Sequence, residues 1–84
     1  MRLIFSNQSW DDCLYWQKNN KQVLRKINQL IKDIKRTPFE GIGKPEPLKH
    51  ELSGFWSRRI TDEHRLVYLV DESGLSIVSC RFHY

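Results

Sequence analysis

The apolar positions divide the chain into a helical half and a strand-like half. Between residues 21 and 36 they recur at the spacing of one face of an amphipathic helix: Val23, Leu24, Ile27, Leu30, Ile31 and Ile34. Thr37-Pro38 ends this helix, because proline disfavours a helical residue before it. A shorter helix is predicted near residues 9–12, whose Ser-x-x-Asp pattern is typical of a helix N-terminus. It places on one face Trp10, Cys13, Leu14 and Gln17, and residues 18–20 separate the two helices.

The strand-like half begins after an irregular loop at residues 38–47, where prolines and glycines disfavour both helix and central strand. Further strands are predicted at residues 2–5, 48–52, 55–61, 65–70 and 75–82. The order of elements is therefore β-α-α-β-β-β-β. Because the strands are segregated from the helices, this order predicts an α+β fold, with an antiparallel sheet of four to five strands covered on one face by an N-terminal helical hairpin.

Length and charge narrow the class of protein. A chain of 84 residues has room for one core, so residues 1–84 are predicted to form a single domain. The formal net charge of +4 favours an anionic partner, either nucleic acid or an acidic protein. The apolar run near Met1 is too short for a signal peptide or a membrane span. A cytoplasmic location without a membrane partner is therefore expected.

The two cysteines, Cys13 and Cys80, lie far apart in the sequence and among apolar residues. They form no Cys-x-x-Cys or Cys/His ligand spacing, so neither a metal site nor another cofactor is predicted. A secreted domain of this size usually contains more disulfide bridges. We therefore expect both cysteines to be reduced side chains of the core.

The predicted helix at residues 21–36 has a strongly basic outer face. Against the single acid Asp33 stand six cations: Lys21, Arg25, Lys26, Lys32, Lys35 and Arg36. Two interpretations of this face remain open. It is either an ordinary solvated helix surface or a surface for sequence-independent contact with nucleic-acid phosphates.

Turn lengths predict which side chains of the sheet share a face. A three-residue loop at 72–74, with glycine in its last position, aligns Arg65 with Arg81 and places Arg65 on the same face as His83. The opposite face of this hairpin is then apolar and suited to packing on the helices. It consists of Leu66, Tyr68, Val70, Val78, Cys80 and Phe82.

The preceding turn adds a second arginine to the charged face. A two-residue loop would lack the glycine or asparagine that such turns prefer, so three residues, 62–64, are expected. This loop pairs Thr61 with Arg65 and places Arg59 on the face of Arg65. Arg58 then lies on the packed side, beside Trp56 and Ile60.

The turn at Ser53-Gly54 predicts that a carboxylate lies on the same face as these arginines. A two-residue turn at Ser53-Gly54 places Glu46 across from Thr61 and on the charged face. Lys49 has the opposite strand parity and ranks lower, although the prolines beside it make strict alternation unreliable. The converging set is Glu46, Arg59, Arg65 and His83, with Tyr84 beside it.

These groups match the needs of a metal-independent ribonuclease. The 2′-OH of RNA can attack the neighbouring phosphorus, so the protein supplies a base, an acid for the leaving 5′-oxygen, and cations for the developing charge. Glu46 is the candidate base and His83 the candidate acid. Arg59 and Arg65 suit a phosphate because each guanidinium binds two oxygens and stays charged. Tyr84 suits stacking on a splayed base.

Plainer interpretations of the same residues stay open. A glutamate between prolines is commonly a loop acid, and a terminal histidine and tyrosine can be a frayed tail. Strand arginines often pair with nearby acids such as Asp62 or Glu63. His50 and His64 are interpreted as surface histidines with structural rather than catalytic roles.

Four segments closely resemble the YoeB family of the RelE/ParE toxin superfamily. They are Gly43-Lys-Pro-Glu-Pro-Leu-Lys49, Leu52-Ser-Gly-Phe-Trp-Ser-Arg-Arg-Ile-Thr61, His64-Arg-Leu-Val-Tyr68 and Cys80-Arg-Phe-His-Tyr84. The resemblance extends over the whole chain. It implies a RelE-like fold and the toxin of a bacterial type II toxin-antitoxin pair, an endoribonuclease that cleaves messenger RNA in the ribosomal A site and so inhibits translation.

The resemblance also implies roles for individual residues and partners. By position, it implies Glu46 as general base and His83 as general acid, with Arg65 acting on the phosphate beside them. It implies substrate contacts from Lys49, Arg59 and Tyr84, and so restores Lys49. The implied partners are the ribosome with its A-site mRNA, a YefM-like antitoxin, and a second copy of the toxin in a homodimer.

A rival hypothesis is a binding module that acts without chemistry. The ParE branch of the superfamily acts in this way, by poisoning gyrase. Inhibition of supercoiling with mRNA left intact would favour this rival.

Overall fold

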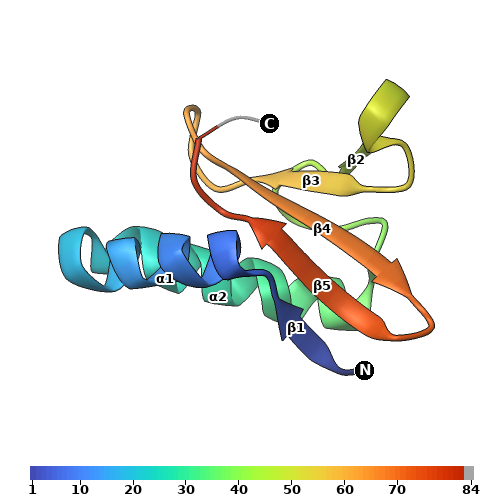
Figure 1. Cartoon of the computed structure of the whole chain (residues 1–84). Helices are drawn as coiled ribbons and strands as arrows, with labels where there is room; N and C mark the ends of the chain where they lie inside the picture. Colours follow the sequence, from blue (N-terminus) through green and yellow to red (C-terminus); the bar gives the residue numbers. More distant parts are fainter. Residues whose placement is uncertain (83–84) are drawn as a thin grey trace.

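The computed structural model describes residues 1–82, and they form a helical hairpin packed on one face of a sheet (Figure 1). The elements are β1 (Leu3–Phe5), α1 (Asn7–Asn19), α2 (Lys21–Arg36), β2 (Glu46–Pro47), a 3-10 turn (His50–Leu52), β3 (Trp56–Arg59), β4 (Arg65–Asp71) and β5 (Gly74–Ser79). This arrangement confirms the predicted α+β fold with its N-terminal helical hairpin.

The sheet has the strand order β1-β5-β4-β3-β2. Three of the four strand pairs are antiparallel, but β1 runs parallel to β5, so the sheet is mixed rather than wholly antiparallel. Only a tight hairpin forces two neighbouring strands to be antiparallel. β1 and β5 are instead joined through the rest of the chain, so their relative direction is free to differ.

The contact between β1 and β5 depends on Gly74. The N–H of Leu75 donates to the carbonyl of Arg2 at 2.7 Å, and a Cβ atom on residue 74 would collide with that carbonyl. The φ angle of Gly74, +131°, is also one that residues with side chains rarely adopt. Glycine at this turn therefore lets the edge strand approach the sheet.

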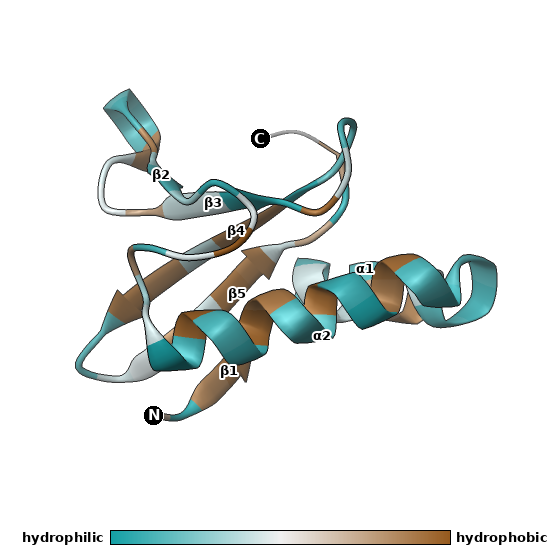
Figure 2. Ribbon diagram, turned by 180° about the vertical axis from the view of Figure 1, so that it is seen from behind, coloured by the Kyte–Doolittle hydropathy of each residue, from teal (hydrophilic) through white to brown (hydrophobic). Residues whose placement is uncertain are grey.

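α2 agrees with the sequence prediction at both ends. Asn20 caps it by accepting from the N–H groups of Gln22 and Val23, and Thr37 follows its last turn. The predicted apolar stripe is buried, and Figure 2 shows it as brown segments on the side toward the sheet. The buried apolar residues are Val23, Ile27, Leu30, Ile31 and Ile34.

α1 buries a different face from the predicted one. Trp10 and Leu14 are 52% and 43% exposed, whereas Trp16 is buried. The reason lies in two polar residues that bind the backbone at and after β5. The hydroxyl of Ser9 donates to the carbonyl of residue 77 at 2.7 Å, and a carboxylate oxygen of Asp12 accepts from the N–H of residue 80 at 2.9 Å. Hydrophobic spacing alone does not reveal such polar contacts.

The β4–β5 hairpin corrects the predicted register. Asp71 pairs with Gly74, so the loop has two residues rather than three. A bulge in the ladder beyond Tyr68 then restores the expected alignment, with Val67 opposite Ser79. Because a one-residue shift exchanges the two faces of a strand, the core receives Leu75 and Ile77 in place of Val78. Phe82, also expected in the core, is 51% exposed.

In the β2–β3 and β3–β4 connections, the observed strand pairing is shifted from the predicted pairing by an even number of residues. Arg65 pairs with Arg59 rather than with Thr61, and Glu46 pairs with Ser57 rather than with Thr61. An even shift preserves the face on which each side chain lies, so the predicted faces hold. The strand predicted at residues 48–52 is wrong, because a 3-10 turn with His50 in the left-handed region (φ 57°) occupies that segment.

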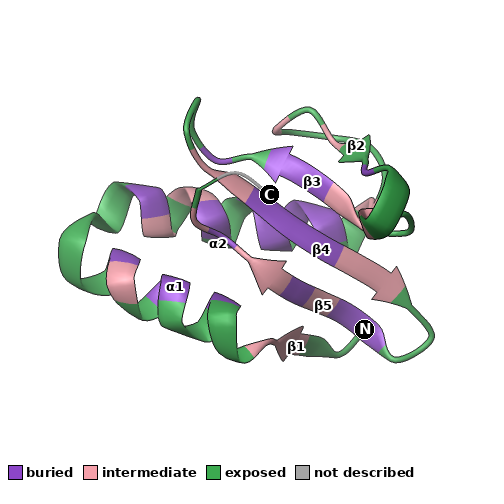
Figure 3. Cartoon of the chain, turned by 45° about the horizontal axis from the view of Figure 1, so that its top comes forward, coloured by how far each residue is buried: buried purple, intermediate pink, exposed green. Residues whose placement is uncertain are grey.

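The core lies between the helices and the inner face of the sheet, where Figure 3 shows the buried segments. Cys13 and Cys80 are both buried free thiols with their sulfur atoms 3.8 Å apart, as predicted for reduced core residues. Among residues 1–82, no helix is long and apolar enough to cross a membrane.

Candidate active site

The face of the sheet away from the helices carries three of the predicted site residues. Paired residues of a ladder share a face, so Glu46 lies on the same face as Ser57, its partner in β3. Arg59 is two residues farther along β3 and pairs with Arg65 of β4. Glu46 and Arg59 are thus diagonal neighbours, with Cα atoms roughly 7–8 Å apart. The predicted convergence of Glu46, Arg59 and Arg65 on one face is confirmed.

Arg59 and Arg65 face each other directly across two strands. Like charges in this position destabilise a sheet. A bound phosphate between the two guanidinium groups would offset that repulsion through charge-assisted hydrogen bonds. The pair is therefore better suited to an anionic ligand than to holding the sheet together.

The guanidinium of Arg65 is oriented by the β3–β4 loop. Its Nη1 donates to the carbonyls of Thr61, Asp62 and His64 at 2.7, 3.1 and 3.1 Å. These contacts fix one edge of a half-buried side chain, while Arg59 is exposed. The expected pairing of strand arginines with Asp62 or Glu63 carboxylates does not appear among the ion pairs of the described residues.

Lys49 lies close to Glu46 although strand parity ranked it lower. The chain leaves the ladder after β2, and Lys49 is the residue before the 3-10 turn. Glu46, Lys49 and His50 help to line one hollow of about 280 Å³. The break in strand geometry, which the prolines had indicated, brings a third cation beside the carboxylate. The predicted residues His83 and Tyr84 lie outside the described part of the chain.

A buried ion pair holds the segment that leads to Glu46. Arg58 is fully buried and donates from Nη1 to Oδ2 of Asp33 in α2 at 2.6 Å. Its guanidinium also donates to the carbonyls of Thr37, Glu40 and Ile42 at 2.7, 2.9 and 3.1 Å. We call this arrangement the Arg58 clasp. It confirms that Arg58 lies on the packed side of the sheet.

The carboxylate of the clasp is held in its charged form. The hydrogen bond from Arg58, with a second from the N–H of Ile42, holds the pKa of Asp33 below its usual value. The next residues are tied to β3 by the N–H of Arg59, which donates to the carbonyl of Gly43 at 2.6 Å. The loop that carries Glu46 is therefore fastened to both α2 and β3.

His64 was expected at the surface, but its side chain is only 12% exposed. Its Nδ1 accepts the N–H of Phe82 at 2.7 Å, and its ring lies edge-on to Trp16 with the centroids 4.8 Å apart. The sequence did contain a signal, since the predicted alignment of Arg65 with Arg81 also places His64 opposite Phe82.

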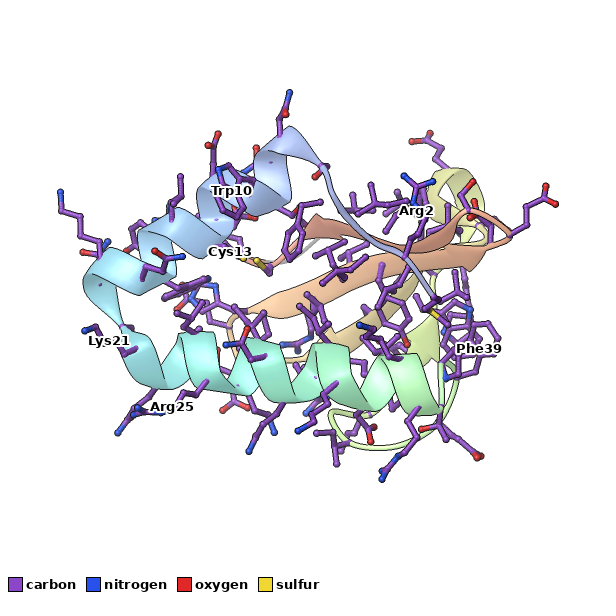
Figure 4. All side chains as sticks on the ribbon, turned by 90° about the horizontal axis from the view of Figure 1, so that it is seen from below. Arg2, Trp10, Cys13, Lys21, Arg25 and Phe39 are labelled. Carbon is purple, nitrogen blue, oxygen red and sulfur yellow. The ribbon has the colours of Figure 1, made fainter. Side chains whose placement is uncertain are left out.

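The basic face of α2 is a separate surface. Lys21 and Arg25 project away from the sheet in Figure 4, and a hollow of about 680 Å³ runs along the helix. It is lined by Lys26, Gln29, Lys32, Asp33, Arg36 and Ile42. Both interpretations made from the sequence, solvated face and phosphate contact, are compatible with this exposure. Within residues 1–82, no three His, Cys, Asp or Glu side chains come close enough to hold a metal ion.

Comparison with known proteins identifies the class to which this fold and site belong. Residues 5–84 match the family model described as the YoeB-like toxin of the bacterial type II toxin-antitoxin system. This chain therefore belongs to the family of YoeB-like toxins. The toxin YoeB of Escherichia coli strain K12 is 68% identical over 84 residues, which is 100% of both chains.

Solved structures agree with this assignment. A YoeB/ParE toxin from Agrobacterium tumefaciens superposes with a TM-score of 0.97 at 55% identity, covering 100% of both chains. A YoeB-YefM complex and a YoeB dimer, both from Staphylococcus aureus, match with TM-scores of 0.92 and 0.93 at 52% and 50% identity. Each covers 100% of this chain and 98% of the other.

Proposed function

We propose that this toxin is a ribosome-dependent, metal-independent endoribonuclease of the cytoplasm that cleaves mRNA in the A site and so inhibits translation. The observation that carries the proposal is the convergence of Glu46, Arg59 and Arg65 on the face of the sheet away from the helices. A carboxylate beside two facing guanidinium groups offers a proton acceptor next to a phosphate site.

The reaction divides these groups by role. Glu46 takes the proton of the 2′-OH as that oxygen attacks the adjacent phosphorus. Arg65 and Arg59 stabilise the charge that develops on the phosphorane oxygens, and Lys49 adds a third cation at the edge of the site. His83 protonates the leaving 5′-oxygen, and Tyr84 stacks on the nucleotide. The products are a 2′,3′-cyclic phosphate and a free 5′-hydroxyl.

The partners follow from the same reaction and from the relatives. The exposed basic face of α2 supports contact with ribosomal RNA phosphates, which would present the mRNA to the open face of the sheet. A YefM-like antitoxin and a toxin homodimer are proposed because the Staphylococcus aureus YoeB structures are a YoeB-YefM complex and a dimer.

The test is cleavage of mRNA on programmed ribosomes, with the new 5′ ends mapped. Glu46→Gln and His83→Gln should each lower the cleavage rate about 10²- to 10⁴-fold, because each removes one proton transfer. The matched control is Glu72→Gln, which neutralises an exposed carboxylate in the β4–β5 turn and should cleave like the wild type. Full cleavage by folded Glu46→Gln protein would refute the assignment. Inhibition of gyrase with mRNA intact would favour the binding-module rival.

A further inference from the structure

The backbone of Phe82 is held at both of its polar groups. Its N–H donates to Nδ1 of His64 at 2.7 Å, and its carbonyl accepts from the N–H of Arg65 at 3.1 Å. Its φ angle of 63° lies in the left-handed region, which is uncommon for a residue with a bulky side chain. Such a conformation persists only where the surroundings hold it. Figure 1 shows the chain after β5 running beside the loop between β3 and β4.

The imidazole that makes this contact is itself fixed in orientation. Its ring lies edge-on to Trp16 of α1, and the Nε1 of Trp16 donates to the carbonyl of Cys80 at 2.9 Å. The Nε2 of His64 faces a carboxylate oxygen of Glu63 at 3.6 Å. Because Nδ1 accepts a hydrogen bond, the proton of the neutral ring lies on Nε2, toward Glu63. Trp16 thus supports residue 80 directly, through its hydrogen bond, and residue 82 indirectly, through its contact with the His64 ring.

The two hydrogen bonds that hold the backbone of Phe82, from its N–H to His64 and to its carbonyl from Arg65, are called here the Phe82 clamp. The clamp contributes little to the core. Phe82 is 51% exposed. Its ring contacts the imidazole of His64 and the guanidinium of Arg81, and it does not pack among the buried core residues. What the two hydrogen bonds fix is the direction of the backbone. That direction matters because His83 and Tyr84 follow immediately in the sequence.

We propose that His64 is a positioning residue for the catalytic end of the chain, acting through its Nδ1 on the backbone of Phe82. This inference rests on the proposed function, since it assigns His64 to the placement of the general acid. Arg65 takes part on both sides: its guanidinium lies at the phosphate site, and its backbone N–H holds the carbonyl of Phe82. The clamp therefore holds the backbone of residue 82, to which the proposed acid is joined in sequence, beside the phosphate site.

The test uses two substitutions that separate the ring of His64 from its acceptor. His64→Phe keeps an aromatic ring against Trp16 but removes the acceptor. His64→Asn places an amide oxygen near the position of Nδ1 and removes the ring. We expect His64→Phe to lower kcat on programmed ribosomes about 10²-fold with little change in KM, because small misplacement of a catalytic group costs this much. His64→Asn should recover at least part of that loss even if it is less stable.

A second readout reports the contact without the reaction. In ¹⁵N-labelled wild-type protein, NMR should detect scalar coupling between the Phe82 amide nitrogen and Nδ1 of His64, and heteronuclear relaxation should show an ordered Phe82 amide. In His64→Phe protein that amide should become mobile. Absence of the coupling, or wild-type kcat in His64→Phe protein, would overturn the inference. Wild-type protein that shows the coupling but does not cleave would instead overturn the proposed function and, with it, the catalytic purpose of the clamp.

Discussion

Arg58 and Arg59 are adjacent in β3, yet they lie in opposite environments. Arg58 points to the helices, is fully buried, and donates to Asp33, to three loop carbonyls and to the hydroxyl of Tyr68. Arg59 points to the open face, is exposed, and stands opposite a second arginine. A buried guanidinium needs its donors satisfied, whereas an exposed one beside a like charge is available to a phosphate.

This difference separates scaffold from chemistry within one strand. Alternation in a strand sends successive side chains to opposite faces, so a single register decides which arginine stabilises the fold and which serves the site. The Arg58 clasp also fastens the loop that leads to Glu46, so the scaffold on one face determines the geometry on the other. Substitution of Arg58 should therefore lower the stability of the fold, whereas substitution of Arg59 should lower activity and leave stability nearly unchanged.

The largest expected effect is on stability, from Arg58→Met. Removing this guanidinium takes one donor from the Asp33 carboxylate, which keeps those of Arg36 and of the Ile42 N–H. It also removes the donors to three carbonyls, and breaking a buried pair costs up to about 3–5 kcal/mol. Urea denaturation followed by tryptophan fluorescence should show a large fall in the unfolding midpoint. Arg59→Met is the matched control, because a change at an exposed position away from such contacts stays within about 0.5 kcal/mol. Equal midpoints for the two variants would show that the clasp is not what holds the loop.

The second largest effect is on cleavage, and here Arg59→Met, rather than Arg58→Met, is the variant that should change. Loss of one donor to the developing phosphorane charge should lower cleavage on programmed ribosomes about 10²-fold while the unfolding midpoint stays near that of the wild type. Arg59→Lys keeps the charge but not the bidentate fork, so its cleavage rate should lie between those of the wild type and Arg59→Met. Wild-type cleavage by Arg59→Met protein would return this arginine to a plain surface role.

The smallest effect is the pH dependence contributed by Asp33. Because its pKa in the folded protein is lowered, its contribution to stability is fully present above the unfolded pKa of about 3.9. That contribution is lost as pH falls below 3.9 and through the folded pKa. Asp33→Asn should reduce the slope of unfolding free energy against pH in this acid range by at most about one proton. An unchanged slope would mean that the carboxylate is not held charged by Arg58.

Particular residues show how far the sequence could go in predicting the site. Glu46, Arg59 and Arg65 were placed on one face correctly although two turns were longer than predicted, because both errors were even. The odd error at the β4–β5 loop moved Val78 out of the core. Phe82 lies beyond the bulge that restores the predicted alignment, and it is exposed where the chain after β5 takes a φ angle of 63°. Loop length at this turn depends on how tightly the chain bends around Gly74 and on a bulge farther along, and neither has a local sequence signature.

The sequence by itself determined α2, the segregation of strands from helices, and the alternation that divides Arg58 from Arg59. These follow from local periodicity, which is a property of neighbouring residues. Only the tertiary structure decided that β1 joins β5 in parallel, that Ser9 and Asp12 bind the backbone beside β5, and that His64 holds Phe82. Each of these contacts joins segments far apart in the chain, and its energy depends on distances that no local pattern specifies.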